Sequence, residues 1–216
     1  MKNLSKWNRE EIMNMEQRYR AQFINSLPGY KSAFLVGTQD TLDQTNLAII
    51  SSITHLGSHP PLMSIIMRPN SVPRHTIENL KATGFFTFNA VSVDRVEDAH
   101  QTSARYERNQ SEFSECNFTP EWEEGIVAPF VKESPLQIGL KLKQIIPLEI
   151  NGCDLVIGEV ILVKAPQEII QSDGAINISD LDIASVTGLD RYHRSEELTR
   201  LTYAKPDKNP LEMTEK

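Results

Sequence analysis

Apolar residues recur at helical spacing close to the start of the chain. They occupy one position in every three or four, at Ile12, Met15, Tyr19, Phe23 and Leu27. Asn8 and Glu11 have the spacing of a capping box, and Pro28-Gly29 is a typical helix stop. The pattern predicts one amphipathic helix within an N-terminal extension, residues 1–29, that packs against a sheet or a second subunit.

Strand-like runs of apolar and β-branched residues dominate the next part of the chain. There are four of them, at residues 33–38, 46–54, 62–67 and 85–91. A short helix is expected between the third and the fourth, with Thr76 as its N-cap and Gly84 just past its end. Asp94 and Glu97 indicate a further helical stretch toward Tyr106.

The second half of the chain contains the clearest strand signal. Leucine or isoleucine occupies every even position from 136 to 142, and the residues between them are polar or glycine. This alternation predicts a strand with one wet face, paired through an Asn151-Gly152 hairpin turn with residues 155–163. Many strands with few helices predict a mainly β fold, a β-barrel with added helices, followed by a loose tail at residues 206–216.

Composition and charge exclude several classes of function. The chain has 22 basic and 29 acidic residues among 216, a net charge of −7, which argues against nucleic-acid binding. Its apolar runs are too short to span a bilayer, and no signal peptide is evident, so we expect a cytoplasmic protein without membrane contact. Cys116 and Cys153 lie far apart without a CxxC pattern, which is typical of reduced thiols.

The residues best suited to bind an anion lie between positions 67 and 79. A strand end, a loop with two prolines and a helix start follow one another there, and the free N–H groups of a helix start favour an anion. Arg68 and Arg74 can add charge-assisted hydrogen bonds, and Thr76 can add a hydroxyl. The stretch fits a phosphate cradle or, alternatively, a polar loop whose arginines pair with carboxylates.

Two further stretches offer polar groups to a ligand. The strand at residues 46–54 turns polar at Ser51-Ser52, whose hydroxyls either meet a flat heterocycle, face solvent or cap a turn. Tyr192-His193-Arg194 either covers a ligand or forms a solvated turn.

Other chemistries find little support in the sequence. His55 and His59 stand four residues apart, but glycine and prolines around them indicate a loop, and without a third ligand we expect no metal site. The chain has no Gly-x-Ser-x-Gly, no Walker loop and no Gly-x-Gly-x-x-Gly. A nucleotide cofactor would therefore bind without a Rossmann turn.

Taken together, the order of these motifs resembles that of the flavin reductase-like domain proteins, which have the FMN-binding split barrel of Greek-key type. The resemblance covers residues 30–205, and residues 102–106 and 111–113 resemble a lid region found in one branch. The other matching segments are Asn46-Leu47-Ala48, Ser51-Ser52, Pro60-Pro61-Leu62, Arg74-His75-Thr76, Asn79, Gly84, Phe86-Thr87-Phe88-Asn89, Gly158-Glu159-Val160 and Gly188-Leu189-Asp190-Arg191-Tyr192.

The resemblance implies a homodimer with non-covalent FMN at the subunit interface. Carried over by position, the phosphate contacts would be Arg68, Arg74, His75 and Thr76. The isoalloxazine would lie along Ser51, Ser52 and Ile53. Asn89 would lie close by, and Tyr192 and His193 would add contacts.

The resemblance also implies an oxidoreductase, an NAD(P)H-dependent flavin reductase in which hydride passes from the nicotinamide to flavin N5. The cofactor carries this chemistry, so no side chain is singled out as catalytic. One alternative is an FMN-binding electron carrier, similar to flavoredoxin, without its own nicotinamide site. Another is a dimeric binding module without flavin. An electron-accepting protein could be a further partner.

Overall fold

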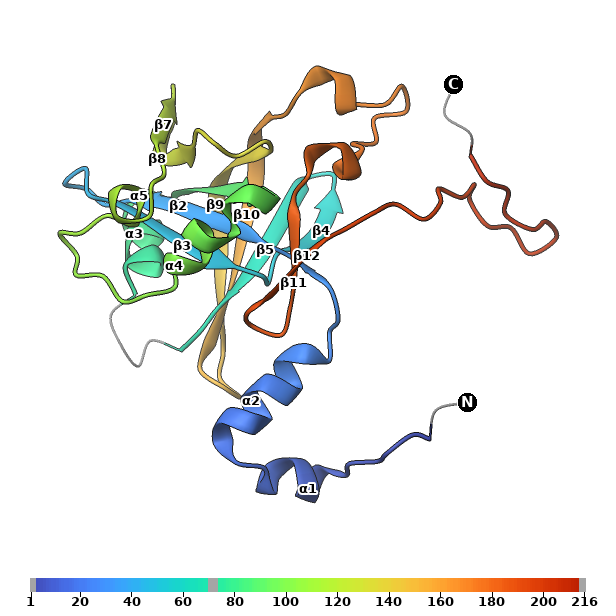
Figure 1. Ribbon diagram of the computed structural model, residues 1–216. Helices are drawn as coiled ribbons and strands as arrows, with labels where there is room; N and C mark the ends of the chain where they lie inside the picture. The colour runs from blue at the N-terminus through green and yellow to red at the C-terminus, as the bar shows by residue number, and fades with distance from the viewer. Residues whose placement is uncertain (1–2, 70–73, 214–216) are drawn as a thin grey trace.

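A seven-stranded antiparallel sheet forms the body of the protein (Figure 1). The computed structural model describes residues 3–69 and 74–213. The strands of the sheet are β2 (Phe34–Gln39), β3 (Thr45–Ile50), β4 (Thr54–Ser58), β5 (Pro61–Met67), β6 (Phe85–Ala90), β9 (Gln137–Leu148) and β10 (Cys153–Lys164). Their order is β3-β2-β6-β9-β10-β5-β4, so the prediction of a mainly β fold is confirmed.

Smaller elements surround this sheet. A three-stranded sheet contains β1 (Lys31–Ser32), β11 (Ala184–Thr187) and β12 (Arg191–Arg194), and a ribbon contains β7 (Pro120–Glu123) and β8 (Ile126–Val131). The helices are α1 (Arg9–Asn14), α2 (Gln17–Ser26), α3 (His75–Thr83), α4 (Val96–Gln101) and α5 (Glu112–Glu115), with 3₁₀ turns η1 (Val93–Arg95), η2 (Gln167–Ile169) and η3 (Ile178–Leu181). Both α4 and α5 lie against the edge strand β3. No helix in the described part of the chain has the length and apolar character needed to cross a membrane.

The core lies between the curved sheet and α3. Phe86, Phe88 and Leu80 are completely buried there. Gly158 on β10 faces Phe86 so closely that an added Cβ would lie 2.5 Å from the Phe86 Cζ atom. Only a residue without a side chain fits at this position, because the ring already fills the space.

The N-terminal segment forms two helices where the pattern predicts one. The capping box is confirmed: the Asn8 side chain accepts from the Glu11 N–H at 3.0 Å, and the Glu11 carboxylate accepts from the Asn8 N–H at 2.7 Å. The single helix is wrong, because the Glu16 carboxylate accepts from the N–H groups of Arg18 and Tyr19 and so starts a second helix. A side-chain cap thus interrupts an otherwise continuous apolar stripe.

Two other boundaries differ from the predicted ones. The run at residues 46–54 is two strands, β3 and β4, because the chain leaves strand geometry at residues 51–53. The N-cap of α3 is Arg74 and not Thr76, which lies buried in the first turn. The helix ends as predicted at Gly84, whose φ of +75° is left-handed. The hairpin at Asn151-Gly152 is confirmed by the register of β9 and β10.

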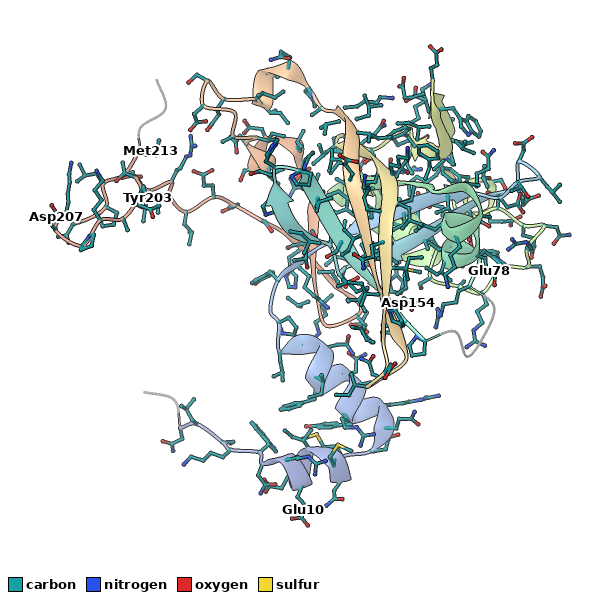
Figure 2. The ribbon with its side chains drawn as sticks, turned by 180° about the vertical axis from the view of Figure 1, so that it is seen from behind. Glu10, Glu78, Asp154, Tyr203, Asp207 and Met213 are labelled. Carbon is teal, nitrogen blue, oxygen red and sulfur yellow. The ribbon has the colours of Figure 1, made fainter. Side chains whose placement is uncertain are left out.

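Both ends of the chain project from the body (Figures 1 and 2). The helices α1 and α2 form one arm, with Trp7, Tyr19 and Leu27 at least half exposed. The C-terminal segment forms the other arm, in which Thr202 N–H donates to the Leu211 carbonyl at 2.9 Å. Figure 2 shows Tyr203, Asp207 and Met213 on this arm, away from the sheet. Within the helical arm, the Phe23 ring of α2 meets the Trp7 ring edge-on at 5.3 Å between centroids.

Candidate functional site

At the amino end of α3, the side chains of Arg74 and His75 lie beside backbone N–H groups that no described side chain caps. Arg74 is the N-cap, and no described side chain caps the helix. Its Nε donates to the Pro69 carbonyl at 3.1 Å, and its backbone N–H donates to Glu78 Oε1 at 3.3 Å. His75, partly buried, is the first helical residue. Three of the predicted phosphate contacts, Arg74, His75 and Thr76, are thus consecutive at a helix start, where an anion is stabilised.

A buried polar network fixes Thr76. Asn46 of β3 donates from Nδ2 to the Thr76 hydroxyl at 3.0 Å and to the Thr38 hydroxyl at 3.3 Å. Asn79 donates to the same Thr38 hydroxyl at 3.3 Å. Because the Thr76 oxygen accepts from Asn46, its own O–H remains a donor for another group. The donor set at this helix start therefore fits a phosphate: the Thr76 hydroxyl, the Arg74 guanidinium and helix N–H groups.

The end of α4 and the start of α5 are hydrogen-bonded to the edge strand β3. Thr102 Oγ1 accepts from the Ile49 N–H at 2.9 Å, and Glu112 Oε2 accepts from the Leu47 N–H at 3.0 Å. Burial raises the pKa of Glu112, and the hydrogen bond from Leu47 partly opposes this. These side chains supply partners for an edge strand that would otherwise be open. The segment between α4 and α5 corresponds to the predicted lid region.

Arg108 of this segment reaches α3. Its Nη1 donates to Glu78 Oε2 at 2.9 Å, its Nη2 donates to Asn79 Oδ1 at 3.3 Å, and its Nε lies 3.7 Å from Asp40 Oδ2. With His75, Asn46 and Asn79 it lines a small pocket beside the helix start. The sequence analysis missed Arg108, because an isolated arginine in a loop gives no signal of its partners 30 residues away.

The connection between β3 and β4 carries the predicted ring contacts. Ser52 Oγ donates to the Ile66 carbonyl at 3.2 Å and accepts from the Ile66 N–H at 3.1 Å. Ser51 is partly buried, and Ile53 packs on the main core. The Ser52 hydroxyl thus bonds to both backbone groups of Ile66 in β5, a role that the sequence analysis did not consider, and contact of residues 51–53 with a ring stays a prediction.

Arg68 links this region to the small sheet. It is exposed directly after β5. Burial lowers the pKa of Lys31, and the nearby charge of Arg68 lowers it further. Lys31 in turn donates to the Gly188 carbonyl at 2.8 Å, in the turn between β11 and β12. The end of β5 and the small sheet therefore meet at a positively charged surface.

Tyr192 and His193 follow each other on β12, and their side chains have different partners. The Tyr192 hydroxyl lies 2.9 Å from His100 Nδ1, and burial raises the pKa of Tyr192. His193 Nε2 lies 2.9 Å from Thr187 Oγ1, and its ring meets the Tyr30 ring edge-on at 4.9 Å between centroids. Successive residues of a strand face opposite sides, so the two rings do not share one contact surface.

Asn89 has a structural position and is not a surface residue. Its side chain is fully buried; Nδ2 donates to the Leu35 carbonyl at 3.3 Å and to Thr87 Oγ1 at 2.9 Å. Its Oδ1 accepts from the Val131 N–H at 2.9 Å. The Asn89 amide therefore connects β2, β6 and β8 inside the fold, and the proximity of Asn89 to a flavin ring stays a prediction.

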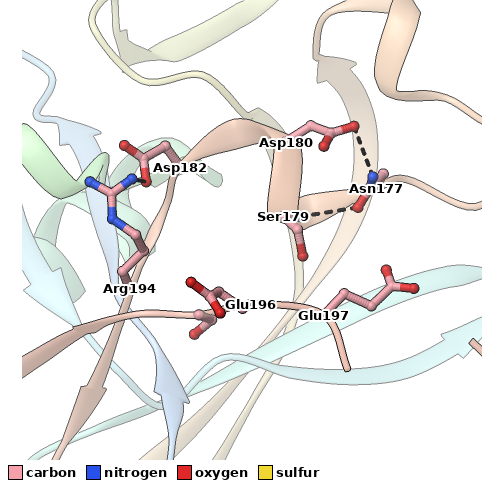
Figure 3. Close-up of a pocket in the computed structure, with 8 residues that line it drawn as sticks. Asn177, Ser179, Asp180, Asp182, Arg194, Glu196 and Glu197 are labelled. Atoms are coloured by element: carbon pink, nitrogen blue, oxygen red, sulfur yellow. Dashed lines mark hydrogen bonds and ion pairs between the residues drawn. The ribbon is translucent and has the colours of Figure 1, made fainter. Parts of the chain in front are cut away.

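A second polar region lies between η3 and the start of the C-terminal arm (Figure 3). It is a pocket of about 370 Å³ and contains none of the ten predicted contacts. Its lining residues are Asn177, Ser179, Asp180, Asp182, Arg194, Ser195, Glu196 and Glu197. Arg194, the cation of this lining, pairs with Asp182. With four carboxylates the pocket disfavours a phosphate.

No described group of histidine, cysteine and carboxylate side chains has an arrangement that could hold a metal. The sequence suggested a loop around His55 and Gly57, but both residues lie in strand β4. Cys116 is buried, Cys153 is partly buried, and neither forms a disulfide.

Comparison with known proteins gives a consistent result. The sequence profile of the flavin reductase like domain family matches residues 31–178. A structure assigned as a flavin reductase with a split barrel domain, from Shewanella frigidimarina NCIMB 400, is 48% identical, with a TM-score of 0.89 over 93% of this chain and 100% of that one. Flavoredoxin of Desulfovibrio vulgaris (Miyazaki F) is 26% identical, with a TM-score of 0.69 over 82% of this chain and 91% of that one.

A more distant structure has the same fold. Nitrilotriacetate monooxygenase component B from Bacillus cereus is 22% identical, with a TM-score of 0.82 over 93% of this chain and 100% of that one. The sequence match and the fold agree with the resemblance inferred from the motifs. The chain belongs to the flavin reductase-like domain family and has its split-barrel fold.

Proposed function

We propose that this protein is a cytoplasmic, homodimeric oxidoreductase that binds FMN without a covalent bond and accepts electrons from NAD(P)H. The observation that carries the proposal is the amino end of α3, where Arg74 and the Thr76 hydroxyl flank a helix start that no described side chain caps. Family membership supports flavin as the ligand. When bound, FMN supplies the hydride acceptor at its N5 atom.

The roles of the residues follow from their positions. Arg68 and Arg74 would neutralise the phosphate, His75 would contact it, and Thr76 would donate its hydroxyl hydrogen. The backbone of Ser51, Ser52 and Ile53 would face the polar edge of the ring, since the Ser52 hydroxyl is held by Ile66. Donors near the ring stabilise the negative charge that develops on reduction. Of Tyr192 and His193, which face opposite sides of β12, one would add a contact to the same flavin.

Exposed apolar side chains support a homodimer. Trp7, Met13 and Tyr19 on the helical arm, and Leu198 and Tyr203 on the C-terminal arm, are each at least half exposed. Solvated arms with this composition are typical of segments that become buried on association. Light scattering after gel filtration should give twice the monomer mass; a monomer would contradict this part of the proposal.

The second candidate function is an FMN-binding electron carrier without a nicotinamide site. The likeness to a flavoredoxin, at 26% identity, favours it. Steady-state oxidation of NADH and NADPH with added FMN separates the two functions: turnover supports the reductase, and a flavin-loaded protein that oxidises neither supports the carrier.

The decisive experiment is a visible absorption spectrum of the purified protein with mass analysis of the released cofactor. A flavin spectrum and the mass of FMN are expected. A colourless protein that takes up no added FMN would overturn the proposal and favour a flavin-free binding module.

A further inference from the structure

Glu78 places a negative charge where the proposed phosphate would bind. It lies in the first turn of α3, and its Oε1 accepts from the N–H of the N-cap residue Arg74 at 3.3 Å. A carboxylate at a helix start is stabilised by the helix dipole, so it competes with any other anion there. Without a counter-charge, Glu78 would repel a phosphate.

Arg108 supplies that counter-charge. Its guanidinium donates to the second oxygen of Glu78 at 2.9 Å and lies 3.7 Å from Asp40, whose side chain is only 12% exposed. The same guanidinium donates to Asn79 Oδ1 at 3.3 Å. Figure 2 shows Glu78 at the margin of the body, on the side of the molecule opposite the C-terminal arm.

Asn79 connects Arg108 with the phosphate contact Thr76. The path runs from Asn79 to the Thr38 hydroxyl, and Asn46 donates to both Thr38 and Thr76. These four residues are almost completely buried, so their orientations depend on one another. A change at Asn79 is therefore expected to alter the direction of the Thr76 hydroxyl.

We propose that Arg108 is a positioning residue for the phosphate site: it cancels the charge of Glu78 and fixes Asn79, and so keeps the helix start receptive to an anion. The inference rests on the proposed FMN function and assigns to the segment between α4 and α5 a role in phosphate affinity. Arg108 itself does not touch the phosphate.

This role differs from a contribution to stability. The Arg108 side chain is 45% exposed, and exposed ion pairs add little to the free energy of folding. Removal of the guanidinium should leave the fold intact and weaken the binding of ligands that carry a phosphate. Riboflavin, which has the same ring without the phosphate, provides the comparison.

The experiment is a fluorescence titration of the full-length protein with FMN and with riboflavin. For Arg108→Ala we expect the Kd for FMN to rise about tenfold, the effect of one uncompensated charge at this range. The Kd for riboflavin should change less than about twofold, and the FMN effect should shrink as salt is added. Adding Glu78→Gln to Arg108→Ala should restore most of the affinity, because the amide keeps the acceptor for Arg74 without the charge.

Lys143→Ala is the matched control. Lys143 of β9 is 49% exposed, and its Nζ lies 3.0 Å from Glu159 Oε2 of β10. The substitution therefore removes the cation of a similar exposed ion pair in another part of the molecule. Its Kd for FMN should equal that of the wild type. Arg108→Lys keeps the charge but cannot donate to Glu78 and Asn79 at the same time through a planar guanidinium. Its loss of FMN affinity should be smaller than that of Arg108→Ala.

Each other outcome contradicts a defined part of the proposal. If the wild type binds FMN and Arg108→Ala binds it equally well, the inference is wrong and the proposed function stands. Equal weakening for FMN and riboflavin, without rescue by Glu78→Gln, would assign Arg108 a purely structural role and also overturn the inference. If the wild type binds neither flavin, the proposed function fails and the inference fails with it.

Discussion

The amino end of α3 and the acidic pocket beside η3 are both polar and both open to solvent, yet they differ in charge and in order. At α3, Arg74 stands at a helix start, and the Thr76 hydroxyl is held by buried Asn46. In the pocket, Asp182 and its partner Arg194 are each about half exposed, and three further carboxylates are close by.

The difference shows that volume does not identify the anion site. The acidic pocket encloses about 370 Å³, whereas the space beside the start of α3 is far smaller in this structure. A phosphate is stabilised by donors whose orientation is fixed before binding, and only the α3 region provides them. Carboxylates on exposed chain would have to be neutralised first.

The largest expected effect is on FMN affinity when the α3 donors are removed. The double change Arg74→Ala and Thr76→Ala should weaken FMN binding about hundredfold, since one charge-assisted and one neutral hydrogen bond are lost. Riboflavin affinity should be almost unchanged, and the protein should stay folded by circular dichroism. The matched change in the acidic pocket, Ser179→Ala with Glu196→Gln, should leave both affinities as they are. Unchanged FMN affinity in the α3 variant would remove the phosphate assignment.

A second comparison uses one asparagine from each region. Asn46 is 6% exposed and donates to two hydroxyls, whereas Asn177 in the pocket donates to Asp180 at 2.8 Å on exposed chain. Asn46→Ala should destabilise the protein by about 1–3 kcal/mol and weaken FMN binding about fivefold, because Thr76 loses its orientation. Thermal unfolding and titration measure the two effects. Asn177→Ala should leave FMN affinity unchanged; an equal loss in both variants would contradict the distinction between the regions.

A buried carboxylate near the α3 region, Glu112 of α5, makes stability depend on pH. Burial raises the pKa of Glu112 above its ordinary value of 4.5. A raised pKa means that the folded state holds the proton more tightly, so the stabilising contribution is complete below pH 4.5 and is lost as the pH rises through the folded pKa. Glu112→Gln should therefore gain in Tm relative to the wild type as the pH rises toward 7, by less than about 4 °C.

Glu196→Gln, an exposed carboxylate of the pocket, is the control for this pH series. Its Tm should stay within about 1 °C of the wild type at each pH. A Glu112→Gln variant whose difference from the wild type does not change with pH would show that the Glu112 proton is not linked to folding.

Periodic and local features of the fold were predictable from the sequence. The alternation at positions 136–142 and the Asn151-Gly152 turn predict the β9–β10 hairpin, because strand period and turn chemistry are local properties. The break at Glu16 was not predictable from the apolar stripe, since a side-chain cap overrides periodicity. The prediction of one strand over residues 46–54 was wrong for a similar reason. Ser52, at the break between β3 and β4, bonds to Ile66 of β5, and this contact exists only in the folded protein.

The candidate site was predictable only where its residues are consecutive. Arg74, His75 and Thr76 follow one another, so a helix start brings them together without long-range contacts. Asn89 and Arg108 show two things that the sequence does not reveal. Asn89 is polar in sequence and buried in the structure, while Arg108 gains its role from partners 29 and 30 residues away. Tertiary packing decides both, and no local pattern reports it.

The smallest expected effect tests whether the ion pair of the acidic pocket matters at all. Asp182 has a φ of +49°, a left-handed conformation that asparagine tolerates and alanine does not. Asp182→Asn removes the charge that pairs with Arg194 and should change the stability by less than about 0.5 kcal/mol, because both side chains are about half exposed. Asp182→Ala should cost about 1–2 kcal/mol through its backbone, although it removes the same ion pair. If the two variants unfold at the same lowered temperature, the ion pair and not the backbone orders the pocket, and the contrast with the preorganised start of α3 would be weaker than the structure indicates.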